Sequence, residues 1–172
     1  MNKDESLALY AKGKEAWNIW ANEMLAKKAK LEENGEWQIN IFSKEGLNSA
    51  TKDWVAQASV DFSGHVFEVV DIDFSNFIFP YCANYKSAKF SGEAKFNEAT
   101  FSDNVWFINA TFCRATEFMY TTFSGDAEFN DATFSGYAEF SKTKFNGEAG
   151  YNSAKFSSEA KFNGATFSRE AW

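Results

Sequence analysis

The 172-residue sequence is poor in several residue types on which common protein classes depend. It has one proline, one histidine and only two cysteines, Cys82 and Cys113, with no C-x-x-C pattern and no clustered histidines. We therefore expect two free thiols in a reducing cytoplasm, not a disulfide or a metal site. No Gly-rich phosphate loop, HExxH or GxSxG motif is present, so we expect no enzymatic activity and no cofactor.

Long runs of apolar or of basic residues are also missing. No stretch approaches the ~20 consecutive apolar residues of a membrane span. The acidic N-terminus has no apolar core of the kind found in a signal peptide. The formal net charge is −7 and no long basic run occurs, which disfavours direct binding to nucleic acid. The length fits one domain, or one domain with an appendage.

Phenylalanine is abundant, at 20 residues, and regularly spaced. From residue 72 to residue 170 the sequence consists of nine eleven-residue units, each a pentad followed by a hexad. The 18 central positions hold 16 phenylalanines, with Tyr85 and Tyr151 in the other two. The residue two positions before each centre is alanine in twelve cases and threonine in three. The rule is therefore small-x-Phe-x-x, with one extra residue in alternate repeats.

This spacing excludes a helix and favours a β-solenoid. On a helix, steps of five and six residues at about 100° per residue would point the phenylalanines in every direction. On a strand, residues two apart share a face, so Ala94 and Phe96 both point inward while Lys95 points outward. The Asn, Ser, Asp and Gly residues between them fit corners because they tolerate tight turns, and glycine does so especially at positive φ. Walls this short must pair with the coils above and below, which stacks the phenylalanines along the axis.

The repeats resemble those of the pentapeptide-repeat family, in which Leu or Phe is central and Ala lies two residues earlier. "AKFNE", "AEFND" and "AKFNG" match this motif directly, and "ATFSDN" and "ATFSGY" carry the sixth residue of a Phe-centred branch with alternating five- and six-residue repeats. The resemblance implies a right-handed, four-sided β-helix in which two eleven-residue units make one coil and alternate corners are wider. We thus expect a mainly β protein with an N-terminal α-helical segment at 1–57 and the solenoid at 58–172, regular from 72.

The segment before the repeat, "SLALYAKGKEAWNIWANEMLAKKAKLEENG", predicts one long helix closed by Asn34 and Gly35. Its apolar stripe contains Tyr10, Trp17, Trp20 and Met24. The motif Gly13-x-x-x-Trp17-Asn18-x-Trp20 is similar to a leader that precedes the solenoid in some bacterial pentapeptide-repeat proteins. We expect the stripe to cover the open first coil, with a dedicated partner site as the alternative.

Two short stretches connect this helix to the regular repeat. "EWQINIF", with Trp37, Ile39 and Phe42, predicts a short strand or an extended linker, and "LNSATKDWVAQA" predicts a second, short helix. "VDFSGHVFEVVDIDF" predicts a degenerate first coil, with one surplus residue before Ile72. The single histidine, His65, falls at an inward-type position there, and we expect a packed or rim residue, not a catalytic one.

Stacking equivalent positions of successive coils predicts the outer surface. Most columns mix signs or hold small polar groups, but one corner column reads Asn104, Asp126, Glu148 and Glu170, with Asp103 and Asp131 next to it. Solvated charge explains such a column, and so does a cationic partner. Some pentapeptide-repeat proteins resemble B-form DNA and bind DNA gyrase, so the resemblance allows gyrase or another topoisomerase as a partner. Residues 72–172 carry 12 acidic and 9 basic groups, a net charge of −3, which weakens that alternative.

Three functions therefore compete. A structural or protein–protein interaction module leads, a gyrase-binding DNA mimic is the alternative, and ice binding by outward threonines is disfavoured because lysines interrupt their columns. "FSREAW" begins a new pentad without its phenylalanine, so the chain is either a piece of a longer repeat or docks its last coil on a second copy. We expect homo-oligomer formation through this end, with Phe156, Phe162, Phe167 and Trp172 near the contact.

Overall fold

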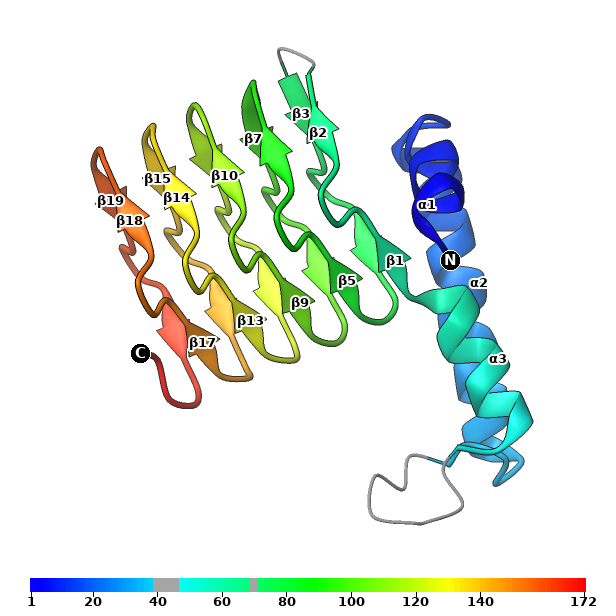
Figure 1. Cartoon of the computed structure of the whole chain (residues 1–172). Helices are drawn as coiled ribbons and strands as arrows, with labels where there is room; N and C mark the ends of the chain where they lie inside the picture. The colour runs from blue at the N-terminus through cyan, green and yellow to red at the C-terminus, as the bar shows by residue number, and fades with distance from the viewer. Residues whose placement is uncertain (39–46, 69–70) are drawn as a thin grey trace.

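The computed structural model of the protein describes residues 1–38, 47–68 and 71–172. Three helices stand at one end of a β-solenoid of twenty short strands (Figure 1). The helices are α1 (Lys3–Tyr10), α2 (Lys14–Glu33) and α3 (Ser49–Ala58). The strands form four parallel five-stranded sheets, which we call walls A to D.

The strands of each wall recur once per coil. Wall A holds β1 (Val60–Asp61), β5 (Ala83–Asn84), β9 (Val105–Trp106), β13 (Ala127–Glu128) and β17 (Ala149–Gly150). Wall B holds β2 (Val66–Phe67), β6 (Lys89–Phe90), β10 (Thr111–Phe112), β14 (Thr133–Phe134) and β18 (Lys155–Phe156). Wall C holds β3 (Asp71–Asp73), β7 (Glu93–Lys95), β11 (Thr116–Glu117), β15 (Ala138–Glu139) and β19 (Ala160–Lys161). Wall D holds β4 (Ile78–Phe79), β8 (Thr100–Phe101), β12 (Thr122–Phe123), β16 (Lys144–Phe145) and β20 (Thr166–Phe167).

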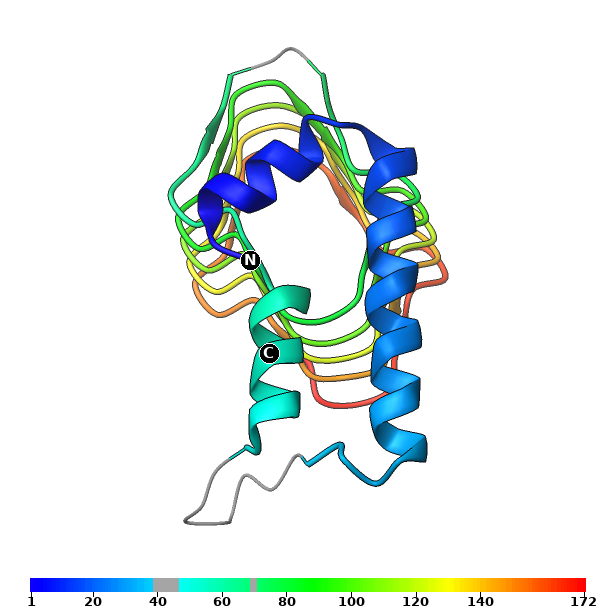
Figure 2. The same cartoon turned by 90° about the vertical axis from the view of Figure 1, so that its right-hand side faces the viewer.

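This architecture is the predicted four-sided β-helix. Seen from the helical end, the chain runs clockwise as it recedes from the viewer, so the winding is right-handed (Figure 2). Strand partners in the regular part are separated by two eleven-residue units, as Thr111 and Thr133 are.

The first coil contains the predicted surplus residue. Val60 pairs with Ala83 and Val66 pairs with Lys89, and each of these separations exceeds two units by one residue. Asp71, in contrast, pairs with Glu93 at the regular separation. The surplus residue therefore lies between Phe67 and Asp71, ahead of Ile72 as the sequence predicted.

The core consists of stacked aromatic rings. Ala94, Phe96, Ala99 and Phe101 are all fully buried, which confirms the inward register of the small residue and the central phenylalanine. In the column through Phe74, Phe96, Phe118, Phe140 and Phe162, neighbouring ring centroids are 4.8–5.1 Å apart. This matches the usual spacing between paired strands, so the same repeat sets the backbone ladder and the ring stack.

Corner chemistry differs from the prediction. The corners after walls A and C each place one residue in the left-handed region, and these residues are mostly not glycines, with φ between 57° and 63° at Asn76, Ser87, Glu98, Asn109, Tyr120, Asp131, Lys142 and Ser153. Gly125, Gly136 and Gly147 lie at the other corners, without positive φ. A Cβ at Gly147 would approach the carbonyl carbon of Gly125 to 2.4 Å. The expected positive φ is confirmed at the corner glycines Gly64 and Gly164, but it is wrong at these three, which allow close stacking of coils.

The N-terminal segment also departs from the prediction, because it forms two helices instead of one. Gly13, the N-cap of α2, has φ 86° and turns the chain between α1 and α2. The predicted end of the long helix is confirmed, since Asn34 is the C-cap of α2 and Gly35 has φ 69°. The predicted second helix is confirmed as α3. Figure 2 shows α1 crossing the end of the solenoid while α2 runs beside it.

Candidate functional site

The helical end continues the ring columns of the solenoid. The ring of Tyr10 lies 4.5 Å from that of Phe74, with 28° between the planes. The indole of Trp17 is fully buried and stacks on Phe62 at 6.0 Å. Aromatic side chains from the helices therefore cover the first coil in the positions that a preceding coil would supply.

The cap also binds the backbone edge of the first coil. The Trp17 indole N–H donates to the carbonyl of Ile78 at 2.8 Å. The Asn18 side-chain amide donates to the carbonyl of Asn76 at 2.8 Å, and its oxygen accepts from the N–H of Ile78 at 3.0 Å. Asn18 thus pairs with β4 as a neighbouring strand would. The sequence motif contained Asn18, but periodicity gave no signal of this role.

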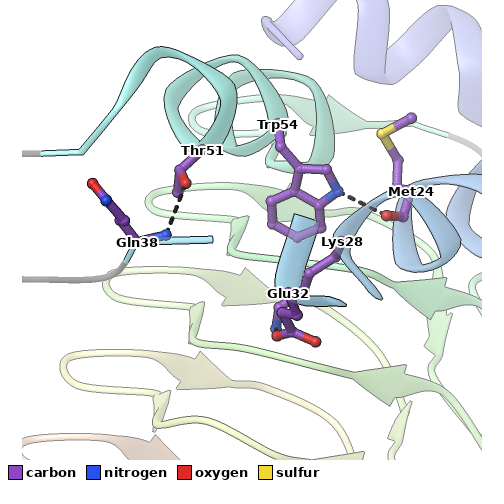
Figure 3. Close-up of polar contacts among 6 residues, drawn as sticks. All are labelled: Met24, Lys28, Glu32, Gln38, Thr51 and Trp54. Carbon is purple, nitrogen blue, oxygen red and sulfur yellow. Dashed lines mark hydrogen bonds and ion pairs between the residues drawn. The ribbon is translucent and has the colours of Figure 1, made fainter. Parts of the chain in front are cut away.

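The remaining stripe residues, Trp20 and Met24, lie between the solenoid end and α3. Trp20 packs edge-on against Trp17, with centroids 5.2 Å apart. Met24 is buried in a second cluster with Trp54, whose indole N–H donates to the Met24 carbonyl at 2.7 Å (Figure 3). Trp37 packs on Trp54 at 5.0 Å, whereas Ile39 and Phe42 lie outside the described residues.

The acidic corner column is a hydrogen-bond ladder. The side-chain oxygen of Asn104 accepts from the N–H of Asp126 at 2.8 Å, and the Asp126 carboxylate accepts from the N–H of Glu148 at 2.9 Å. These side chains are half-buried, while Glu170 is exposed. The column therefore links successive coils at the corner between walls D and A, a role that composition did not indicate.

The other two acidic candidates lie apart from one another. Asp103 precedes Asn104 at the same corner, where its carboxylate lies 3.6 Å from the Cys82 sulfur. Burial, and then the Asp103 charge, raises the pKa of the Cys82 thiol to about 12. Asp131 follows β13, at the corner toward wall B, with φ 57°. Wall A thus separates Asp131 from the column that it was expected to adjoin.

The last coil presents its rings to solvent. Phe156, Phe167 and Trp172 are 36%, 41% and 44% exposed, whereas the central rings of the preceding coils, from Phe62 to Phe145, are buried. Together with Tyr151, Phe162 and Ala171 they line a hollow of about 350 Å³. The residues predicted to lie near a self-association contact, Phe156, Phe162, Phe167 and Trp172, therefore lie together on one apolar face.

The single histidine of the chain is the remaining candidate for chemistry. His65 is half-buried and packs edge-on against Phe67, at 4.5 Å between centroids. Burial and the nearby Lys3 charge lower the pKa of His65. Among the residues that the structure describes, no three His, Cys, Asp or Glu side chains come together as a metal site. In the same part of the chain, none of the helices combines the length and apolar character needed to cross a bilayer.

Comparison with known proteins gives one match. Residues 74–118 match the family model described as pentapeptide repeats, with nine copies. No curated protein and no solved structure matches the chain. The matched segment lies within walls A to D, and the coils that follow keep the same register to β20. Residues 74–118 are thus similar to the repeats of the pentapeptide-repeat family.

Proposed function

We propose that this chain is a non-enzymatic structural or protein–protein interaction module, with residues 1–57 as its cap and residues 58–172 as its solenoid. The contrast between its two ends carries the proposal. At the helical end Tyr10 and Trp17 cover the rings, and Asn18 pairs with the backbone edge of β4. At the other end three large aromatic side chains are at least 36% exposed. Such apolar faces are typical of contact surfaces.

A second copy is the partner that this face fits best. The last coil carries charged groups of both signs, namely Lys155, Glu159, Lys161, Arg169 and Glu170. A self-association through one shared patch is isologous, and this mixture of signs permits it without a uniform charge barrier. The face also has open strand edges at β18, β19 and β20, and open edges favour pairing with another chain.

Sedimentation equilibrium at micromolar concentration tests this proposal. We expect a reversible dimer that Trp172→Asp dissociates and that Ile19→Asp, an equally apolar-to-acidic change at a 57% exposed cap residue, leaves intact. A monomer at all concentrations, unaffected by Trp172→Asp, would argue against self-association. Affinity capture from the host lysate, followed by mass spectrometry, then identifies any other protein that binds the module.

Gyrase or topoisomerase binding is the second candidate, and the acidic corner is the observation that favours it. Asp126, Glu148 and Glu170 follow one another along the corner, and no ion pair joins them to a lysine or arginine of the described chain. A cationic surface of a partner would neutralise such a row. The ladder role of Asp126 gives the carboxylate a structural use as well, so charge and hydrogen bonding must be separated experimentally.

A further inference from the structure

A wide cleft lies in the helical cap, away from both solenoid surfaces discussed above. It has a volume of about 670 Å³ and is lined from all three helices. Trp20 and Met24 of α2 and Ala56 of α3 supply its apolar surface. This size is within the range of small-molecule sites, which combine apolar walls with a few convergent polar groups.

The polar lining of the cleft is predominantly acidic. One carboxylate comes from each helix: Glu5 from α1, Glu23 from α2 and Asp53 from α3. Two cations also line the cleft, Lys27 and the amino group of Met1. The Met1 amino group is already engaged, since it donates to the carbonyls of Ala56 and Ser59. These bonds to neutral carbonyls leave its charge in place, so the lining holds three carboxylates and two cationic groups.

Trp20 differs from Trp37, Trp54 and Trp106, each of which has a lysine over its ring. Lys28 lies over the rings of Trp37 and Trp54, at 5.0 and 5.9 Å from their centroids, and Lys86 lies 4.8 Å from that of Trp106. Within residues 1–38, 47–68 and 71–172, no lysine ammonium lies over the ring of half-buried Trp20. An indole face with carboxylates around it is the environment that an alkylammonium group prefers.

We propose that this cleft binds an alkylammonium ligand, with the ammonium between the Trp20 ring and the carboxylates of Glu23 and Asp53. The aliphatic part of the ligand covers Met24 and Ala56. A diamine would add a second ammonium for Glu5, the third carboxylate of the lining. This site is independent of the C-terminal face, so its failure would leave the interaction-module proposal untouched.

Titration of the full chain with 1,5-diaminopentane, followed by calorimetry and by the indole N–H resonance of Trp20, tests the proposal. We expect saturable one-to-one binding, with Trp20→Phe used to assign the resonance. Glu23→Gln with Asp53→Asn should raise Kd at least tenfold, which corresponds to about 1.4 kcal/mol. Glu33→Gln with Glu36→Gln removes the same charge outside the cleft and should leave Kd within twofold.

Two further comparisons make the result specific. Pentane-1,5-diol has the same chain without charge, and we expect no saturable binding from it. Equal binding of the diol and the diamine, or a diamine Kd that the Glu23→Gln, Asp53→Asn variant does not change, would overturn the proposal. Absence of saturation by the diamine at millimolar concentration in low salt would do the same.

Discussion

Tyr10 lies on Phe74 at 4.5 Å between ring centroids, close to the 5.1 Å that separates Phe74 from Phe96 one coil further on. A residue of α1 therefore extends a column that the repeat itself continues to Phe162. The cap is therefore part of the ring stack, and its removal should destabilise the solenoid as the removal of a coil would.

Truncation of the cap indole should be strongly destabilising. Trp17→Ala removes a fully buried ring and the hydrogen bond to Ile78, and we expect a loss of roughly 3–5 kcal/mol in the free energy of unfolding. Trp17→Phe keeps most of the packing and should cost less. Urea denaturation followed by circular dichroism measures both. A loss below about 1 kcal/mol for Trp17→Ala would mean that the solenoid is stable without this contact.

A ring in the middle of a column should matter more than one at its end. Phe118 lies between Phe96 and Phe140, at 4.8 and 4.9 Å, so Phe118→Ala should cost roughly 3–5 kcal/mol. Phe167→Ala truncates a ring that is 41% exposed and should cost distinctly less. Chemical denaturation of the two variants at a concentration where both are monomeric gives the comparison. Equal losses would contradict the difference in burial.

Replacement of one core tyrosine should stabilise the fold. The hydroxyl of Tyr85 is buried among phenylalanine rings and has no hydrogen-bond partner among the described residues. Tyr85→Phe removes an unpaired polar group, for which the penalty is about 1–3 kcal/mol, so the free energy of unfolding should rise. Tyr120→Phe is the control, because the Tyr120 hydroxyl is at the surface and accepts from Lys142 at 2.8 Å. Denaturant titration compares the two, and a destabilised Tyr85→Phe variant would reveal a partner for the hydroxyl.

The two roles of the acidic corner can be separated by matched substitutions. Asp126→Asn with Glu148→Gln removes both charges but keeps an oxygen that can accept from the N–H of Glu148, as Asn104 does one coil earlier. Asp126→Ala breaks the ladder and should cost about 1 kcal/mol or somewhat more. If the corner binds gyrase, the neutral ladder variant loses any inhibition of supercoiling while its stability stays near that of the wild type. Inhibition that survives charge removal would exclude the corner from the contact.

The two thiols should differ in reactivity. Because its pKa is raised to about 12, the Cys82 thiol stays protonated in neutral buffer, and the thiolate is the form that alkylating reagents attack. We expect iodoacetamide to modify Cys113 well before Cys82, as measured by peptide mass spectrometry in native buffer. Comparable rates in the folded state, with equal rates in urea as the reference, would contradict the raised pKa of Cys82.

Period and register were predictable because they depend on one strong physical rule. A phenylalanine every five or six residues has only one arrangement that buries all the rings, and the surplus residue ahead of Ile72 is visible as a break in that spacing. The break between α1 and α2 was missed, because Gly13 is a single residue within an otherwise helical pattern. Its positive φ depends on how α1 packs across the first coil, which local sequence does not specify.

The corners show a second limit of sequence reasoning. Glycine at a corner indicates either a left-handed φ or a close approach, and the two look the same in sequence. Stacking at about 4.8 Å makes the second cause dominant at Gly125 and Gly147. Sequence alone likewise indicates only a surface charge at Asp126. Its carboxylate accepts from the N–H of Glu148 in the next coil, and a contact between coils leaves no local sequence signal.

The one-residue surplus of the first coil has a consequence for how such a chain can vary in length. Each wall pairs a coil only with its two neighbours, so duplication or loss of a complete coil leaves every remaining contact type unchanged. A single inserted residue must instead be accommodated between two walls, as it is between Phe67 and Asp71. Insertions and deletions in the solenoid should therefore be tolerated when they add or remove a complete coil. The helical cap fits the rings of one particular coil, so the coil that it contacts should not be replaceable in this way.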